Sequence, residues 1–248
     1  LKETTAPQGY AVTTATKFEL KKDGTVDAGS GSDATPVGTS GNLKDVLLVK
    51  DDMTSVKIAK TDITGQNEVA NAVIEIFEAD GTTPAKMWDD NKKDFVDAKW
   101  TSGTSAQEIV GLTGGKTYVL KETTAPQGYA VTTATKFELK KDGTVDAGSG
   151  SDATPVGTSG NLKDVLLVKD DMTVVKISKV DATGKQEVAG AKIEIVDSQG
   201  NTAQMWDESQ GKFVDAKWTS DTKPQTITGL TGGETYTLKE TTAPQGYE

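Results

Sequence analysis

Lys60, Glu122 and Asp170 each follow two apolar residues at alternate positions, in runs that have the pattern of a β-strand. Alternate side chains of a strand share one face, so an amine and two carboxyls would each lie beside the apolar side of a sheet. An ionisable group there is costly unless another group pairs with it. The apolar pairs are, in the same order, Val56 and Ile58, Tyr118 and Leu120, and Leu166 and Val168.

These three groups allow two interpretations. In the first, they form an ordinary ion-pair network where a β-sandwich opens to water. In the second, they react: burial disfavours the charged form of a lysine, and a neutral amine is a nucleophile. A carboxyl kept protonated by the same burial is an electrophile if a second acid, here Glu122, hydrogen-bonds its carbonyl and shuttles protons. The residue pattern leaves both interpretations open.

The strands that would position these groups belong to a series of short alternating segments separated by turns. In the central part of the chain the alternating segments are 56–62, 72–77, 116–122 and 129–139, and no window has a helical period. Turn residues such as Thr64-Gly65 and Asp80-Gly81 separate them. We therefore predict an all-β protein made of immunoglobulin-like antiparallel sandwiches with Greek-key connections.

Long internal repeats divide the chain. Residues 1–54 recur unchanged as 120–173, and residues 175–238 repeat 56–120 with substitutions and one deletion. A period this long indicates tandem domains rather than a solenoid. We predict the end of a preceding domain at 1–54, a complete domain at 55–173 and the start of a following domain at 174–248.

The predicted joints between these domains are short, which favours a stiff rod. They are Asp52-Met53-Thr54 and Asp171-Met172-Thr173. The Gly- and Ser-rich stretch 146–152 fits either a linker or a long surface loop, and the apolar strand predicted after it favours the loop. Leu1 is not an initiator residue, so we expect the chain to be part of a longer protein.

Composition excludes several classes of function. The net charge is -10 without a basic cluster, which argues against binding nucleic acid or an anionic membrane surface. No apolar run is long enough for membrane insertion. The absence of Cys and His removes disulfides, Ser-His-Asp hydrolysis and ordinary zinc sites, and we expect no cofactor or metal. The Asp-rich turn 88–91 could bind calcium, but its spacing is not that of an EF-hand loop.

Two sequence motifs resemble those of a known family. Residues 118–129, YVLKETTAPQGY, resemble the E-box of the collagen-adhesin B-type (Cna B-type) domains. Residues 56–62, followed by 69–72, are similar to the first-strand signature of that family, and the second copy at 188–191 is closer still. The resemblance covers the whole chain.

This resemblance implies an immunoglobulin-like domain of a Gram-positive surface protein with a spontaneous intramolecular isopeptide bond. Carried over to this sequence, the bond joins Lys60 to Asp170, and Glu122 promotes it. Asp stands where the family often has Asn, so water rather than ammonia would leave. Asp171 is an alternative partner, and strand alternation favours Asp170.

The two end fragments carry incomplete sets of the same residues. Glu3 and Asp51 lack a lysine, and Lys179 and Glu240 lack the last strand with its Asp. We expect each set to find its partner outside its own fragment. The partner would lie either in an adjoining chain, where head-to-tail complementation would bring Lys179 to Asp51 of another molecule, or in further repeats of a longer fibre.

The resulting hypothesis is a structural stalk. The repeats would hold an adhesive domain away from the cell wall, extracellularly, and contact neighbouring repeats. One alternative is a module that binds an unidentified host ligand through Trp88 and Trp100, which recur as Trp206 and Trp218. Another is a pilus subunit assembled by sortase. An enzyme acting on other molecules is not expected, because the isopeptide chemistry is a single self-modification.

Overall fold

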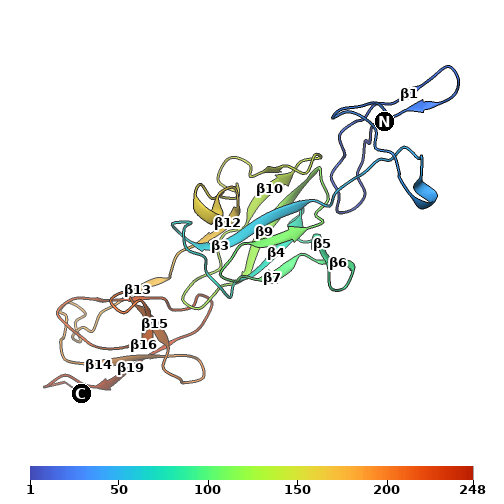
Figure 1. The fold of residues 1–248 in the computed structure, drawn as a ribbon. Coiled ribbons are helices and arrows are strands. Elements are labelled where there is room, and N and C mark those ends of the chain that lie inside the picture. Colours follow the sequence, from blue (N-terminus) through green and yellow to red (C-terminus); the bar gives the residue numbers. More distant parts are fainter. Residues whose placement is uncertain (248) are drawn as a thin grey trace.

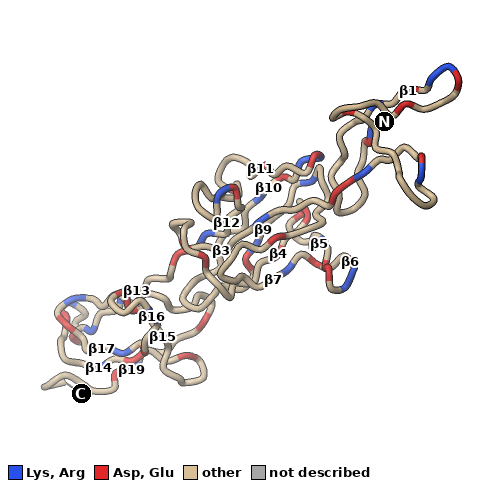
Figure 2. The backbone as a smooth tube through the Cα atoms, viewed as in Figure 1, with Lys and Arg blue, Asp and Glu red and all other residues tan. Residues whose placement is uncertain are grey.

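The computed structural model describes residues 1–247, which form three units in a row along an elongated molecule (Figure 1). The two ends of the chain lie at opposite ends of this row. Acidic and basic residues are interspersed along its whole length (Figure 2). Within residues 1–247, no helix combines the length and apolar character required to cross a bilayer.

The middle unit is a complete sandwich of two sheets. One sheet has the strand order β12-β3-β8, the other has the order β11-β10-β9-β4-β7, and β5 and β6 form a separate hairpin. The elements are β3 (Ser55–Asp62), β4 (Val73–Glu78), β5 (Lys86–Asp89), β6 (Asp94–Asp97), β7 (Lys99–Thr101), β8 (Gln107–Val110), β9 (Lys116–Thr124), β10 (Thr135–Leu139), β11 (Val145–Asp146), the 3₁₀ helix η2 (Gly160–Leu162) and β12 (Leu166–Asp170). The prediction of an all-β chain of tandem sandwiches is confirmed.

One strand pair departs from the predicted antiparallel arrangement. The last strand, β12, pairs in parallel with the first, β3, with Leu166 opposite Ile58 and Val168 opposite Lys60. The chain enters the unit at one end and leaves it at the other (Figure 1). The first and last strands therefore both run from entry to exit, and they can pair only in parallel.

A single core lies between the two sheets, and it is filled from the alternating faces that the sequence predicts. Ile58, Leu120 and Leu166 are each at most 2% exposed. Full burial of such a side chain stabilises a fold by about 1.5–3 kcal/mol. The other large members are Val56, Ile74, Ile76, Ile109, Leu112, Tyr118, Phe137, Leu139 and Val168.

The Gly- and Ser-rich stretch folds back onto the middle unit. Ala147 packs against the core. The Lys136 backbone N–H donates to the Asp152 carbonyl at 2.6 Å, and the Thr154 hydroxyl donates to the Lys136 carbonyl at 2.8 Å. The stretch is therefore a surface loop of this unit.

The flanking units contain only part of a sandwich. The N-terminal unit has β1 (Glu19–Leu20), β2 (Val26–Asp27) and η1 (Gly41–Leu43). The C-terminal unit has β13 (Val174–Ile177), β14 (Lys192–Val196), β15 (Gln204–Asp207), β16 (Lys212–Asp215), β17 (Lys217–Thr219), β18 (Gln225–Thr228) and β19 (Thr237–Thr242).

Consecutive units contact each other through the turn that ends the E-box. At the second junction, the Gly128 N–H donates to the Thr231 hydroxyl at 3.1 Å, and the Gly232 N–H donates to the Tyr129 carbonyl at 2.8 Å. Thr173, in the joint itself, donates its hydroxyl to the Leu230 carbonyl. The short joint is thus fixed by hydrogen bonds to both units.

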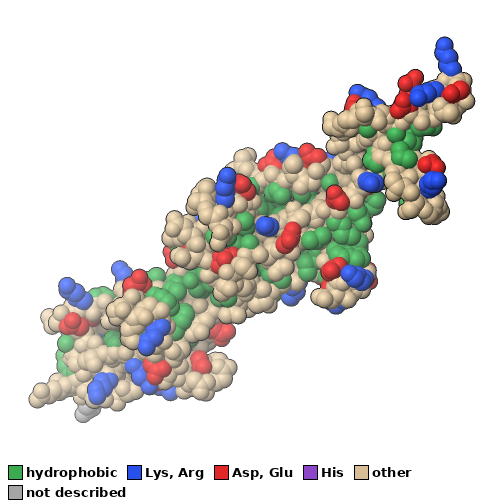
Figure 3. Space-filling view, viewed as in Figure 1, with side chains coloured by type: hydrophobic (Ala, Val, Ile, Leu, Met, Phe, Trp, Pro, Cys, Tyr) green, Lys and Arg blue, Asp and Glu red, His purple; other side chains and the backbone are tan. Residues whose placement is uncertain are grey.

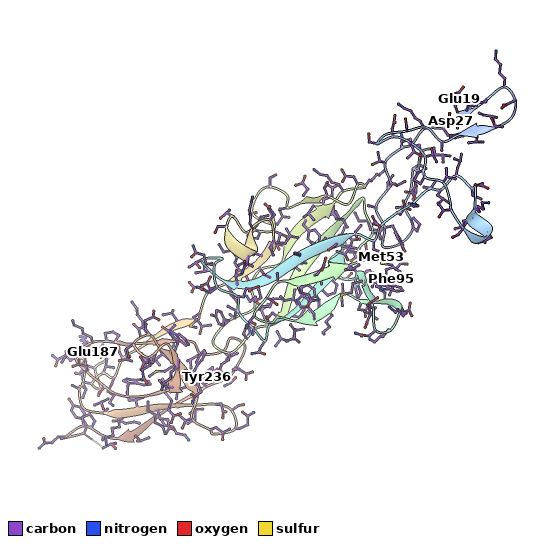
Figure 4. All side chains as sticks on the ribbon, viewed as in Figure 1. Glu19, Asp27, Met53, Phe95, Glu187 and Tyr236 are labelled. Atoms are coloured by element: carbon purple, nitrogen blue, oxygen red, sulfur yellow. The ribbon has the colours of Figure 1, made fainter. Side chains whose placement is uncertain are left out.

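An aromatic ring closes each junction. Phe213 of the β15–β16 hairpin lies so close to Gly128 that a Cβ on this glycine would be 2.7 Å from the ring. Gly9 and Phe95 repeat this contact at the first junction with the same 2.7 Å. Figure 4 shows Phe95 there, beside Met53 of the first joint. Two junctions with the same contacts give the row of units a repeating geometry.

Candidate functional site: a buried lysine between two carboxyls

Lys60 lies on β3 with its side chain in the core. Val56, Ile58 and Lys60 share the buried face of this strand, and Lys60 is only 2% exposed. The ring of Tyr129 lies 6.0 Å from the Lys60 Nζ atom and is itself buried. The predicted alternation therefore places an amine among apolar side chains.

Glu122 reaches the same place from the other sheet. It lies on β9, and its Oε1 atom is 3.3 Å from the Lys60 Nζ atom. The Thr132 backbone N–H donates to its Oε2 atom at 2.8 Å, which fixes the orientation of the carboxyl group.

Asp170 completes the group from the end of β12. Its Oδ2 atom lies 3.0 Å from the Lys60 Nζ atom. The neighbouring Asp171 takes a different position: its N–H donates to the Asp170 Oδ1 atom at 3.1 Å, and its own Oδ1 atom accepts from the Met172 N–H at 2.9 Å. The structure thus brings Lys60, Glu122 and Asp170 together from three strands, and it leaves Asp171 outside the group.

The three side chains are closed to solvent. The side chains of Lys60 and Glu122 are 0% exposed and that of Asp170 is 9% exposed. The interpretation of an ion-pair network open to water is therefore wrong, because the two sheets and Tyr129 cover the group. Burial raises the pKa of Glu122, although the Thr132 N–H and the charge of Lys60 oppose this shift.

The contacts inside the group are close but do not form regular hydrogen bonds. The Lys60 Nζ, Glu122 Oε1 and Asp170 Oδ2 atoms are all buried without a hydrogen-bond partner of acceptable geometry. Buried polar atoms without hydrogen bonds are rare, and each such atom in a native structure calls for an explanation. Lys60 and Asp170 therefore lie in direct contact, with 3.0 Å between the Nζ and Oδ2 atoms.

The end fragments hold partial versions of the site. In the C-terminal unit, the Lys179 Nζ atom lies 3.1 Å from the Glu240 Oε2 atom, with side chains 23% and 31% exposed. In the N-terminal unit, burial and the neighbouring Glu3 raise the pKa of Asp51. Among residues 1–247, Lys179 pairs with Glu240 and with no aspartate.

Two functional contacts were not predicted from the sequence. The Thr132 N–H that holds Glu122 comes from the segment after the E-box, and Thr13 makes the same contact to Glu3 at 2.9 Å. The identical sequence around Thr13 and Thr132 indicates that the two contacts should be alike. The junction contacts of Phe95 and Phe213 were not predicted either, because the residue pattern does not show which aromatic rings meet a neighbouring unit.

The tryptophans occupy structural positions. Trp100 packs against the core of the middle unit, and Trp218 packs against that of the C-terminal unit. Trp88 and Trp206 stack edge-to-face on the junction phenylalanines with ring centroids 5.3 Å apart. Across residues 1–247 there is no cluster of acidic residues arranged to hold a metal ion. In the turn 88–91, the Asp89 carboxylate instead accepts hydrogen bonds from the N–H groups of Asn91 and Lys92.

Comparison with known proteins gives a family and several distant structural likenesses. The family model described as SpaA, prealbumin-like fold domain, matches residues 54–151 and 173–248. No curated protein matches the chain in sequence.

Three solved structures illustrate the distant likenesses. The TIE protein of Bacillus anthracis is 21% identical with a TM-score of 0.37, over 98% of this chain and 35% of that one, so the chain spans about a third of it. A streptococcal ancillary pilin is 19% identical with a TM-score of 0.36, over 82% and 59% of the two chains. The shaft pilin SpaA of Lactobacillus rhamnosus GG is 15% identical with a TM-score of 0.29, over 78% and 88%.

Proposed function

The chain belongs to the family of SpaA prealbumin-like fold domains, and on this premise we propose that its repeats are stalk segments strengthened by internal isopeptide bonds. In the middle unit the bond joins Lys60 to Asp170, and Glu122 promotes it. The stalk would be extracellular and attached to the cell wall of a Gram-positive bacterium. The observation that carries the proposal is the buried amine lying 3.0 Å from one carboxylate and 3.3 Å from another.

The bond forms by loss of one water. A proton leaves the Lys60 ammonium and reaches the Asp170 carboxylate by way of Glu122, which gives a neutral amine and a neutral acid. The Nζ atom attacks the Asp170 Cγ atom, the carboxyl hydroxyl leaves with a second proton from nitrogen as water, and an amide remains. Glu122 is suited to this transfer because its raised pKa makes it a better proton carrier near neutral pH.

The proposed bond lies where it would carry mechanical tension. Lys60 and Asp170 lie on the first and last strands of the unit, so tension along the row of units enters and leaves by the two strands that the bond ties together. The unit could not then extend without the rupture of a covalent bond. In the chain-entropy model, closing a loop of about 110 residues stabilises the fold by about 4–5 kcal/mol.

The repeating junctions also support a stalk rather than a ligand-binding module. Phe95 and Phe213 contact the preceding unit, and the four tryptophans pack on cores or on these rings. Of the tryptophans considered as a host-ligand surface, Trp100 and Trp218 are thus engaged with the cores of their units, and Trp88 and Trp206 with the junction phenylalanines. We expect no turnover on other molecules, because each bond consumes its own lysine and aspartate.

The test is the intact mass of the chain under denaturing conditions. We expect a mass one water below the sequence value, with fragmentation placing the link between Lys60 and Asp170. The Glu122→Gln variant should keep the full sequence mass, whereas the matched Glu240→Gln variant should still lose the water. A wild-type chain with the full sequence mass would show that the three residues are only a buried ion-pair network.

A further inference from the structure

The segment that follows the E-box closes the reactive group of the middle unit. The buried ring of Tyr129 lies 6.0 Å from the Lys60 Nζ atom. Three residues later, the Thr132 N–H donates to the Glu122 Oε2 atom at 2.8 Å. Residues 129–132 therefore cover the amine and orient the carboxyl group that would transfer its proton.

The following unit holds the same segment through its backbone. The Gly232 N–H donates to the Tyr129 carbonyl at 2.8 Å, and the Gly128 N–H donates to the Thr231 hydroxyl at 3.1 Å. A Cβ on Gly232 would lie 2.7 Å from the Cβ atom of Ala130, so the two chain segments are in close contact. One short segment thus contacts both the reactive group and the next unit.

The strand that carries Asp170 is held by the same loop of the following unit, residues 229–232. Three residues after Asp170, the Thr173 hydroxyl donates to the Leu230 carbonyl. The Thr173 carbonyl accepts from the Gly229 N–H at 2.9 Å. The loop therefore holds the end of β12 as well as the segment that covers the amine.

The preceding unit contacts the middle unit away from the reactive group. At this first junction, the Gly9 N–H donates to the Thr113 hydroxyl at 3.2 Å. Hydrophobic side chains gather at the surface of this junction (Figure 3), where Phe95 is labelled in Figure 4. Within residues 1–247, no hydrogen bond joins the preceding unit to the three reactive side chains or to the segment that covers the amine. The two junctions share their contacts, but only the second one lies at the reactive group.

We propose that docking of the following unit positions the reactive group of the unit before it, and this inference rests on the proposed function. Loop 229–232 and Phe213, whose ring lies against Gly128, are the positioning residues. They touch none of the reacting atoms, and they act through the segment over the amine and through the end of β12. A misplacement of about 1 Å can slow a reaction between positioned groups by about 100-fold. The loss of water in the middle unit should therefore be fast only when the C-terminal unit is docked.

The coupling runs in one direction along the chain. The reactive group lies near the exit end of its unit, because Lys60 is two residues before the end of β3 and Asp170 is the last residue of β12. Docking onto the preceding unit therefore leaves the group unchanged, whereas docking of the following unit closes it. Each unit would stay extensible until the next one has folded against it, and would then become cross-linked.

The test compares two phenylalanines that make the same contact at the two junctions. The 248-residue chain is made by cell-free synthesis and quenched in acidic denaturant at successive times, and its intact mass gives the fraction that has lost one water. Phe213→Ala should slow this loss by about 10- to 100-fold, whereas Phe95→Ala should keep the wild-type rate. Phe95 belongs to the middle unit itself, so a mere loss of stability of that unit would give the opposite order.

A second matched pair tests the hydrogen bond between the loop and the E-box turn. Thr231→Val keeps the shape of the side chain but removes the hydroxyl that accepts from the Gly128 N–H, so it should slow the loss of water less than Phe213→Ala does. Thr113→Val removes the equivalent acceptor at the first junction and should keep the wild-type rate. Phe213→Met, which refills the space against Gly128, should recover most of the rate.

Hydrogen exchange tests the positioning directly. In the Lys60→Met background, in which no bond can form, Phe213→Ala should speed exchange of the Thr132 N–H, and Phe95→Ala should leave it unchanged. Equal rates of water loss in the wild type and in Phe213→Ala overturn the coupling between units and leave the proposed function standing. A wild-type chain that keeps its full sequence mass overturns both.

Discussion

The middle and C-terminal units carry the same pair of a lysine and a glutamate in different surroundings. Lys60 and Glu122 are 0% exposed in their side chains, whereas Lys179 and Glu240 are 23% and 31% exposed. Both pairs follow apolar residues on strands of the same type. The difference lies in the strands that cover them, because β10 and β12 close the core of the middle unit and have no counterparts among residues 174–247.

Asp51 and Asp170 likewise have the same sequence context but different neighbours in space. Asp51 and Asp170 have identical neighbours in sequence for more than forty residues upstream. Asp170 lies 3.0 Å from a lysine, and Asp51 lies beside Glu3 instead. A residue's chemistry here depends on which other strands complete its unit.

Of the changes considered, removal of Lys60 should have the largest effect on the stability of the middle unit. Lys60→Met removes the amine of the proposed internal bond, so the free energy of unfolding of the middle unit should fall by about 4–5 kcal/mol. Denaturant unfolding followed by tryptophan fluorescence measures this change. Lys179→Met is the matched control, and it should leave both the internal bond and the unfolding of the middle unit unchanged. An equal loss in both variants would contradict the assignment of the bond to Lys60.

A smaller loss of stability is expected when alanine replaces the glycine in the turn that ends the E-box. Gly128 and Gly246 have φ of +88° and +87°, so alanine costs about 1–2 kcal/mol of local strain at either position. Only at Gly128 would the new Cβ meet a ring, 2.7 Å away on Phe213, whereas nothing lies within 4 Å at Gly246.

Small-angle scattering should therefore separate these two variants. Gly128→Ala should change the angle between the middle and C-terminal units, and Gly246→Ala should leave the scattering profile of the wild type. If both variants scatter alike, the Phe213 contact does not set the orientation of the units.

The smallest expected effect is a pH dependence that only the buried carboxyl should show. In the Lys60→Met background the pKa of Glu122 remains raised by burial, and the opposing lysine charge is gone. Between the ordinary value of 4.5 and the higher folded value, the folded chain holds one more proton than the unfolded chain. The free energy of unfolding should therefore fall as pH rises through this window and recover as pH falls.

The double variant Lys60→Met/Glu122→Gln isolates the contribution of Glu122 to this pH dependence. It lacks the titrating group, so its unfolding free energy should decline less steeply above pH 4.5 than that of Lys60→Met alone. Parallel profiles from urea unfolding across this pH range would show that Glu122 titrates alike in the folded and unfolded chains.

Much of the fold and of the site was accessible from residue pattern. The alternation of Val56, Ile58 and Lys60 predicts the buried face of β3, and it holds in the structure. The parallel pairing of β12 with β3 was not predicted, because strand alternation carries no information about direction. The closure of the site by Tyr129 and Thr132 also depends on a chain segment whose path only the packed sheets define.

The sequence by itself determined the strands, the faces they bury, the repeat and the types of group that could react, since these follow from side-chain period and local turn chemistry. Only the tertiary structure decided which amine meets which carboxyl. That choice depends on strands about 110 residues apart, Lys60 on β3 and Asp170 on β12, and on whether a complete second sheet excludes water from them. The corresponding lysine and glutamate of the C-terminal unit are therefore partly exposed.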